Sequence, residues 1–334
     1  MANRVKPLPV GGIELPGNIL AAPLAGITDY PLRRIARKFG ASLTVSEMIS
    51  SQALVRKSGR SVKMADSAHE EFPLSVQISG SDPDIMARAA AMNESFGAAI
   101  IDINMGCPQR KIVRTGAGAA LMKDMPLAGR IINRVVRTVS VPVTVKMRLG
   151  WDHHSINAVE FARMAEAEGA SMIVVHGRTR KQMFSGEVDW KTIKKVKEEV
   201  RCPVIANGDI RTCDDARRAI EESGADGIMI GRAMLGRPWI FTQVREYLET
   251  GRQTAAPLLE EQYHVAAGHL EGLFSFYGEP VCVWLARKHL AWYTKGMRGS
   301  AAFRQQLNKA KAFKEVAAML ENFYADLLSR EWGE

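Results

Sequence analysis

Residues 74–106, "LSVQISGSDPDIMARAAAMNESFGAAIIDINMG", decide the fold, because two short apolar runs flank one helical segment. The runs "LSVQIS" and "IIDINMG" lack strict polar alternation, which is typical of strands that are buried on both faces. Between them, Asp82 is a candidate N-cap, Pro83 stands in the first helical turn, and Gly97 marks the helix end. The stretch therefore predicts a strand–helix–strand unit with parallel strands.

The same rhythm recurs along the first 250 residues. Six further apolar runs have this character, at 18–26, 43–48, 142–148, 172–178, 203–209 and 227–232. Helical patterns follow several of the runs, at 155–169, 189–200 and 212–224. Eight strands that alternate with helices predict a (β/α)8 TIM barrel. A doubly wound open sheet is the alternative, but the first strand is not followed by a G-x-G-x-x-G turn.

The chain changes character after residue 250. No strand-like run recurs there, and the remaining segments have the pattern of amphipathic helices, at 259–278, 281–296 and 300–328. We therefore expect two domains, a barrel over residues 1–250 and a small all-helical C-terminal domain over 251–334.

Composition favours a cytoplasmic globular protein. Hydrophobic residues make up 46% of the 334 residues and charged residues 24%, which is ordinary for such a protein. The four cysteines form no C-x-x-C pair, and few scattered cysteines suit a reducing compartment. We find no signal peptide, no apolar run of about 18 residues for a membrane helix, no convincing set of metal ligands, and no sign of a stable protein partner.

We expect the active site at one end of the predicted barrel, because the active sites of TIM barrels lie at the carboxyl ends of the strands. Residues with polar side chains or accessible backbone stand there, and they are Pro23, Leu24, Ala25, Gly26, Glu47, Gln77, Asn104, Cys107, Lys146, Arg148, His176, Arg178, Asn207, Gly208, Asp209, Gly231 and Arg232. Polar groups buried at such a rim are costly unless a ligand satisfies them.

Cys107 and Lys146 are the most reactive candidates. Gly106 and Pro108 flank the cysteine, which indicates a turn rather than a strand interior. The thiol could act as a general acid, could become a nucleophile beside a base, or could be a small buried apolar group. Lys146 could form a Schiff base, could place positive charge beside an electron-rich cofactor, or could simply extend to water.

The ends of the last two strands predict a phosphate site. Loops after strands seven and eight of a TIM barrel often bind phosphate through backbone N–H groups. Here "NGD" at 207–209 and "IGR" at 230–232 supply glycine backbone and Arg232. A phosphate ligand with a lysine, a glutamine and a thiol around one mouth fits flavin mononucleotide, whose ring would lie near Gln77 and Lys146.

Positive charge gathers in the helical segment. The net charge of the chain is +9, and no acidic residue stands between Pro280 and Lys314, a window that holds Arg287, Lys288 and six further lysines and arginines. Such segregation is typical of nucleic-acid binding, so Arg287 and Lys288 are candidate RNA contacts. The alternative is a solvated helix face, with the interleaved aromatic residues in a core.

Taken in order, these motifs resemble the tRNA-dihydrouridine synthases over nearly the whole chain. The most specific match is "IDINMGCPQRKIVRTGAGAAL", and "VQISGSDP", "VPVTVKMR", "VHGRTR", "VIANGDI" and "IGRAMLGRPWIF" follow the order of the family blocks. "SEMISS" and "ARKHLAWY" are most similar to the bacterial B-type branch. The resemblance implies an FMN-dependent enzyme that uses NADPH or NADH to reduce the C5–C6 double bond of a uridine in the D-loop of tRNA.

The resemblance also implies roles for individual residues. Cys107 would be the general acid that protonates C5 of the uracil. The flavin would be bound by Pro23, Leu24, Ala25, Gln77, Lys146, His176, Asn207, Gly208, Asp209, Gly231 and Arg232. The RNA substrate would be bound by Asn104, Arg148, Arg178, Arg287 and Lys288.

Three other functions remain compatible with the residues alone. A flavoenzyme that oxidises or reduces a free pyrimidine would share the barrel and the rim cysteine but would need no basic helical tail. A Schiff-base aldolase would use Lys146 without any flavin. An RNA-binding protein would need neither the cofactor nor Cys107.

Overall fold

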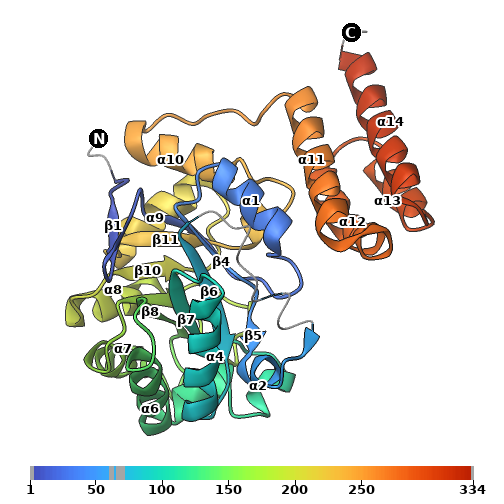
Figure 1. Cartoon of the computed structure of the whole chain (residues 1–334). Coiled ribbons are helices and arrows are strands. Elements are labelled where there is room, and N and C mark those ends of the chain that lie inside the picture. Colours follow the sequence, from blue (N-terminus) through green and yellow to red (C-terminus); the bar gives the residue numbers. More distant parts are fainter. Residues whose placement is uncertain (1–3, 60–63, 65–71, 332–334) are drawn as a thin grey trace.

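The computed structural model describes residues 4–59, 64 and 72–331, and eight parallel strands form its centre (Figure 1). The barrel strands are β3 (Ile19–Ala21), β4 (Leu43–Val45), β6 (Leu74–Ser79), β7 (Ile100–Met105), β8 (Val143–Arg148), β9 (Met172–His176), β10 (Val204–Asn207) and β11 (Gly227–Ile230). They are ordered β4-β3-β11-β10-β9-β8-β7-β6, and pairing of β4 with β6 closes the ring. The short strand β5 (Ile49–Ser50) extends the pairing of β6. The predicted (β/α)8 barrel is confirmed.

The strand register aligns the polar strand ends. Gln77 on β6 pairs with Asp102 on β7, Asn104 pairs with Lys146 on β8, and Arg148 pairs with His176 on β9. Because all eight strands run in parallel, these side chains meet at one mouth of the barrel.

Helices surround the barrel and connect its strands. Their bounds are α1 (Tyr30–Lys38), α2 (Ser51–Val55), α4 (Pro83–Ser95), α5 (Arg110–Val113), α6 (Met125–Val136), α7 (Ala158–Ala167), α8 (Trp190–Glu199), α9 (Cys213–Ser223) and α10 (Ile240–Thr250), with the 3-10 turns η1 (Gly118–Lys123) and η2 (Arg232–Met234). The side chain of Asp82 accepts a hydrogen bond from the Ile85 N–H, as its N-cap position predicts.

One helix begins later than its sequence pattern indicates. The pattern predicts a start at Ser155, whereas α7 begins at Ala158. Ile156 instead forms an antiparallel bridge with Gly150, and the Asn157 N–H donates to the Leu149 carbonyl. These contacts keep residues 155–157 out of the helix, and the local helical pattern does not reveal them.

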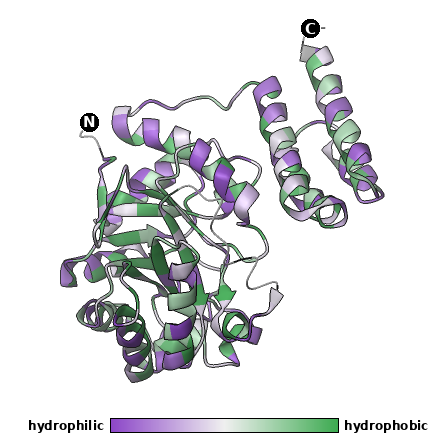
Figure 2. Cartoon of the chain, viewed as in Figure 1, coloured by the Kyte–Doolittle hydropathy of each residue, from purple (hydrophilic) through white to green (hydrophobic). Residues whose placement is uncertain are grey.

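The core has two parts inside the barrel region. Apolar side chains between the strands and the outer helices make the larger part, and hydrophobic residues fill the strands in Figure 2. A second cluster joins inward-facing residues such as Leu20 and Val174 to the N-terminal hairpin of β1 (Leu8–Val10) and β2 (Ile13–Leu15). The apolar rhythm of the sequence does not predict this hairpin, which closes the barrel opposite the polar mouth.

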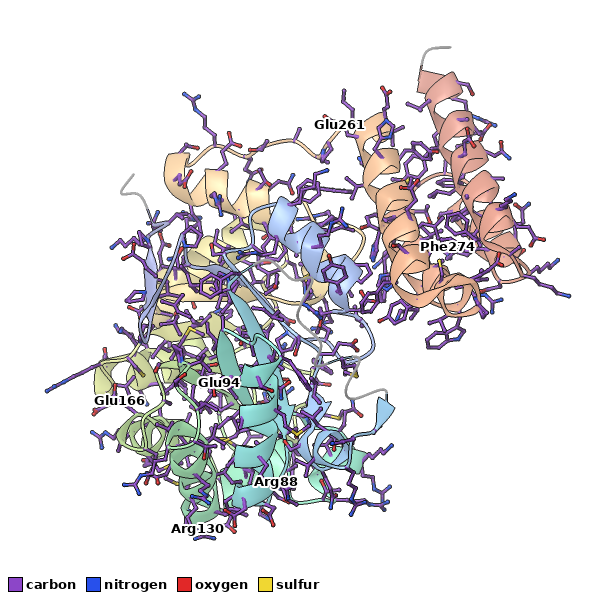
Figure 3. The ribbon with its side chains drawn as sticks, in the orientation of Figure 1. Arg88, Glu94, Arg130, Glu166, Glu261 and Phe274 are labelled. Carbon is purple, nitrogen blue, oxygen red and sulfur yellow. The ribbon has the colours of Figure 1, made fainter. Side chains whose placement is uncertain are left out.

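Two glutamates on outer helices accept hydrogen bonds from backbone N–H groups that lie just before barrel strands. Glu94 of α4 accepts a 2.8 Å hydrogen bond from the Ser140 N–H, and Glu166 of α7 accepts one of 2.6 Å from the Cys202 N–H (Figure 3). Ser140 precedes β8 and Cys202 precedes β10, so this end of the barrel carries contacts that stabilise the fold.

As far as the structure describes the chain, four helices form the C-terminal region, and residues 251–258 connect them to α10. The helices are α11 (Leu259–Tyr277), α12 (Glu279–Tyr293), α13 (Ser300–Leu307) and α14 (Phe313–Glu331). The pattern at 300–328 predicts one helix, and this is wrong, since the chain turns between α13 and α14. The Phe313 N–H donates to Glu279 and fixes the turn. The centroid of the Phe313 ring lies 4.3 Å from that of Phe274, and the two rings are tilted by 35°. Phe274 is labelled in Figure 3.

The helical region packs against the barrel through α1. Helix α11 lies alongside α1 in Figure 1, and the ring centroids of Tyr30 and Phe276 are 5.4 Å apart. Trp239, just before α10, joins the core of the helical region. No helix in the described part of the chain has the length and apolar character that crossing a bilayer requires.

Candidate active site

A cavity of about 400 Å³ opens at the carboxyl ends of the barrel strands. Its walls include most of the residues that the sequence predicts for the site, namely Pro23, Leu24, Ala25, Gln77, Asn104, Cys107, Lys146, Arg148, His176, Asn207, Gly208, Asp209, Gly231 and Arg232. Separate strands and their following loops bring these residues together, as parallel topology requires.

Cys107 lies in a half-buried turn directly after β7. The side-chain oxygen of Asn104 accepts hydrogen bonds from the backbone N–H groups of Gly106 (3.2 Å) and Cys107 (2.9 Å). On the other side, the Ala119 N–H donates to the Cys107 carbonyl over 3.0 Å. Gly118 packs beneath this turn with φ of +62°, and a Cβ atom there would stand 2.9 Å from the Cys107 carbonyl oxygen. The turn is therefore held from both sides.

A chain of buried hydrogen bonds supports the turn from the barrel interior. The Asn104 amide donates to the Gln77 side-chain oxygen over 2.8 Å, and the Gln77 amide donates to Asp102 over 2.6 Å. Thr144 donates its hydroxyl to the second oxygen of Asp102, also over 2.6 Å. Burial raises the pKa of Asp102 to about 6, against the hydrogen bonds from Gln77 and Thr144. Asp102, which is not among the site residues predicted from the sequence, fixes which way both amides face.

Lys146 brings positive charge to the floor of the cavity. Its ammonium donates a 3.0 Å hydrogen bond to the Asn207 side-chain oxygen, and the Asn207 amide donates to the Met229 carbonyl. Burial lowers the pKa of Lys146 to about 8, and the charge of Arg148 acts in the same direction.

Arg148 joins the cysteine turn to the loop at 179–184. Its guanidinium donates to the carbonyl oxygens of Gly106 (2.8 Å), Thr179 (2.9 Å) and Met183 (2.9 Å), and the side chain is 2% exposed. Burial raises the pKa of the Cys107 thiol, while Arg148 and Lys146 act in the opposite direction. The thiol is thus protonated at neutral pH, and two cations stand near it to stabilise a thiolate.

Three arginines surround Asp209 at the ends of β10 and β11. Its carboxylate forms ion pairs with three guanidinium groups. The nitrogen–oxygen distances are 2.5 Å to Arg178, 2.7 Å to Arg232 and 3.2 Å to Arg211. One negative charge faces three positive ones, so the cluster has an excess of positive charge that suits an anion. Asp209 has φ of +43°, a left-handed conformation that is uncommon outside glycine.

The structure places Arg178 behind this cluster rather than in the cavity wall. Its side chain is 1% exposed, and it donates to the Ser185 and Gly186 carbonyls as well as to Asp209. Arg211, which the sequence analysis did not select, lines the cavity instead.

His176 presents an unusual buried nitrogen. Burial, with nearby cationic side chains, lowers the pKa of His176 well below its usual value, so the imidazole is neutral. Its Nε2 atom is buried and has no hydrogen-bond partner among the described residues. A polar ligand atom would satisfy this nitrogen.

Phe184 forms an apolar part of the same wall. Its ring lies 6.3 Å from that of His176, and the Arg232 guanidinium stands 4.8 Å from its centre. Phe184 is not among the residues predicted from the sequence, because no motif marks an aromatic residue in the loop after β9.

The two tail residues occupy different places. Lys288 on α12 donates to the Gly26 carbonyl at the mouth of the barrel, and Gly26 in turn donates its N–H to Glu47. Arg287 faces the other way and donates to the Ala310 carbonyl over 3.2 Å within the helical region.

Comparison with known proteins identifies the family. The family model described as "Dihydrouridine synthase (Dus)" matches residues 19–329. A probable tRNA-dihydrouridine synthase of Rickettsia conorii is 45% identical over 320 residues, which span 96% of this chain and 97% of that one. The tRNA-dihydrouridine synthase B of Pseudomonas aeruginosa is 43% identical over 317 residues, or 95% and 96% of the two chains.

Solved structures with low sequence identity share the fold. Histamine dehydrogenase from Rhizobium sp. 4-9 superposes with a TM-score of 0.58 at 14% identity, over 80% of this chain and 50% of that one. A morphinone reductase variant in complex with tetrahydroNAD gives a TM-score of 0.55 at 12% identity, over 78% and 94% of the two chains. The fold agrees with these structures, and the sequence matches extend over both the barrel and the helical region, so the chain belongs to the dihydrouridine synthase family.

Proposed function

We propose that this protein reduces the C5–C6 double bond of a uridine in tRNA, with FMN as its bound cofactor and NADPH as the source of electrons. One observation carries the proposal beyond the family match. The protonated thiol of Cys107 and the ammonium of Lys146 line the same cavity, whose far side carries the arginine cluster around Asp209. The cavity thus combines a proton donor, a cation and an anion site. This combination suits the reduction of a base beside a flavin ring, with the flavin phosphate at the anion site.

The cavity residues fit FMN in three respects. The unpartnered Nε2 atom of His176 offers a hydrogen bond to a polar group of the ligand. A Cβ atom placed on Gly231 would meet nothing closer than Ala22 Cβ at 3.7 Å, so the backbone there is open to a phosphate. Arg232 and Arg211 supply the positive charge. We assign Gln77 and Lys146 to the ring, and His176, Asn207, Gly208, Gly231 and Arg232 to the ribityl and phosphate groups.

The side chains of this protein then perform the protonation. Reduced flavin supplies the hydride when it is bound. Cys107 holds a proton on Sγ because burial keeps its pKa high, and it donates this proton to C5 of the uracil. The resulting thiolate is stabilised by Arg148 and Lys146, and it regains a proton from water before the next turnover. Asn104 keeps the turn in place through its bonds to Gly106 and Cys107.

The helical region supports an RNA substrate over a free pyrimidine. Lys288 stands at the barrel mouth, and the base of a folded RNA must leave its stack to enter the cavity. An enzyme for a small metabolite needs no such basic extension.

A direct experiment tests the proposal. The purified protein should show the visible absorption of an oxidised flavin, and NADPH with tRNA should convert a uridine to dihydrouridine, which is mapped by mass spectrometry. Activity should fall steeply between about 50 and 200 mM salt, because RNA binding releases counterions. A colourless protein, or faster turnover of free uracil than of tRNA, would refute the proposal.

A further inference from the structure

A second cavity, of about 600 Å³, lies between the barrel mouth and the helical region. Its walls come from α1, from the segments that follow β3 and β4, and from α11 and α12. They include Tyr30, Arg33, Glu47, Phe276, Val281 and Trp284. None of these residues belongs to the active-site cavity.

The two cavities share one thin wall. Leu24, Ala25 and Ile27 line the active-site cavity, whereas Gly26, between them in the chain, lines the second one. Side chains on the side of the second cavity hold this turn in place. Gly26 donates its N–H to Glu47, and its carbonyl accepts a hydrogen bond from Lys288. The two cavities therefore lie on opposite sides of one turn of the chain.

The carboxylate of Glu47 favours a base over a phosphate at its own position in this cavity. Glu47 is a carboxylate on a surface that the proposed function assigns to a polyanion, and it would repel a phosphate group. Its Oε1 atom accepts from Gly26, and in the described part of the chain no group bonds to Oε2. Asp29 is occupied differently, since it accepts the Leu32 N–H as the N-cap of α1. Among the described residues, the Oε2 atom of Glu47 is thus available as an acceptor for the N–H groups of a ligand.

Aromatic groups beside Glu47 supply a stacking face. Trp284 on α12 is 64% exposed, which is unusual for so large an apolar side chain, and Val281 one turn away is 42% exposed. The Lys288 ammonium lies 5.6 Å from the centre of the Trp284 ring. An exposed indole beside a cation is the arrangement that binds a base together with its phosphate.

We propose that this cavity binds a guanine that neighbours the target uridine, with the base on Trp284 and its N1–H and N2–H groups donating to Glu47. Guanine is the base that presents two adjacent donors to a carboxylate; adenine, cytosine and uracil each place an acceptor beside their donor. Lys288 stands where it can meet the phosphate of the same nucleotide. This inference rests on the proposed function and adds a recognition site to it.

Base substitution in the RNA tests the inference without altering the protein. Once the target uridine is mapped, tRNA transcripts are made in which each guanine within two nucleotides of it is replaced by inosine, which lacks only the N2 amino group. With the FMN-loaded enzyme, we expect inosine at one of these positions to lower kcat/KM roughly tenfold, since a hydrogen bond to a charged group is lost. The Glu47→Gln variant, which retains an acceptor for Gly26, should distinguish guanine from inosine by less than about threefold, because its amide bonds more weakly than a carboxylate.

One further variant and two controls complete the test. Trp284→Ala should weaken tRNA binding roughly tenfold through lost stacking and leave the flavin spectrum unchanged. The controls are Leu258→Ala, an apolar residue that is 74% exposed, and Glu260→Gln, whose side chain is 74% exposed; both lie outside the cavity and should bind tRNA normally.

The outcomes separate this inference from the proposed function. If unmodified tRNA is reduced but inosine makes no difference at any position, the guanine site is refuted and the reductase stands. Equal discrimination by the wild type and Glu47→Gln would also overturn the assignment. If no tRNA is reduced at all, both proposals fail.

Discussion

The side-chain amide of Gln77 donates a 2.6 Å hydrogen bond to the carboxyl group of Asp102, its register partner on the adjacent strand. Because this bond occupies the amide nitrogen, the Gln77 oxygen must face Asn104, whose own oxygen then faces the Cys107 turn. A buried acidic group thus sets the orientation of the groups that hold the thiol.

The buried charge of Asp102 makes folding stability depend on pH. Burial raises its pKa from 3.8 to about 6, so the folded state binds this proton more tightly than the unfolded state does. The resulting stabilisation is complete below about pH 4 and is lost as the pH rises through about 6. A shift of roughly 2 units corresponds to about 3 kcal/mol. The prediction concerns the difference in the free energy of unfolding between the wild type and Asp102→Asn. This difference should fall by about 3 kcal/mol between about pH 4 and 7, as measured by urea denaturation.

The matched control is Glu249→Gln on α10, which removes an exposed carboxyl group. The pH dependence of the stability difference should be larger for Asp102→Asn than for this control. A flat difference for Asp102→Asn would show that Asp102 titrates as an exposed carboxyl group does.

Gly118 should be required for the position of the thiol. An alanine there would place Cβ 2.9 Å from the Cys107 carbonyl oxygen and 3.1 Å from Cys107 Cβ, with φ of +62°. We expect Gly118→Ala to lower kcat roughly tenfold or more and to destabilise the fold by about 1 kcal/mol or more, with flavin binding retained. Gly268→Ala in α11, where a Cβ meets nothing within 4 Å, is the matched control. Wild-type kcat in Gly118→Ala would mean that the turn tolerates displacement.

The Cys107 thiol should be slow to alkylate at neutral pH. Burial raises its pKa above that of a free cysteine, so little thiolate is present. The folded protein is labelled with iodoacetamide, and the peptide that contains Cys107 is then quantified by mass spectrometry. The rate of Cys107 alkylation should rise at a higher pH than the rate for free cysteine. Arg148→Met removes a cation that lowers this pKa and should move the profile to still higher pH. Rapid labelling of Cys107 at about pH 7 would contradict a proton-donor role.

Lys146 should make flavin binding sensitive to alkaline pH. Its pKa of about 8 means that the ammonium charge is present below that pH and is lost above it. The affinity of the apoprotein for FMN should therefore fall as the pH rises through about 8, as followed by quenching of flavin fluorescence. Lys146→Met should bind FMN more weakly at neutral pH, and its affinity should change less than that of the wild type on going to alkaline pH. An identical pH dependence in both proteins would show that another group is responsible.

The barrel and the position of its site were predictable because they follow from local patterns and a general rule. Strands buried on both faces are recognisable as apolar runs, and parallel topology brings their carboxyl ends together. This rule predicts Gln77, Cys107, Lys146 and Arg232 as site residues, and all four line the cavity. Their binding roles stay predictions.

Other features depend on contacts between distant segments, which a local pattern does not contain. The hairpin of β1 and β2 closes the barrel through side chains from many strands. Arg178 has the sequence context of a rim residue, yet it folds back behind Asp209. The sequence does indicate that Asp102 is unusual, because a carboxylate in the middle of the apolar run "IIDINMG" needs buried partners. Which residues those partners are depends on the strand register, which the sequence does not show.

The most direct test of the central claim is single-turnover reduction of tRNA by the Cys107→Ala variant, with the flavin reduced beforehand and dihydrouridine measured by mass spectrometry. The account predicts normal flavin absorption, normal tRNA binding, and a rate of dihydrouridine formation that is lower by roughly 100-fold or more, the usual loss when a general acid is removed. Dihydrouridine formation at the wild-type rate would show that Cys107 is not the proton donor.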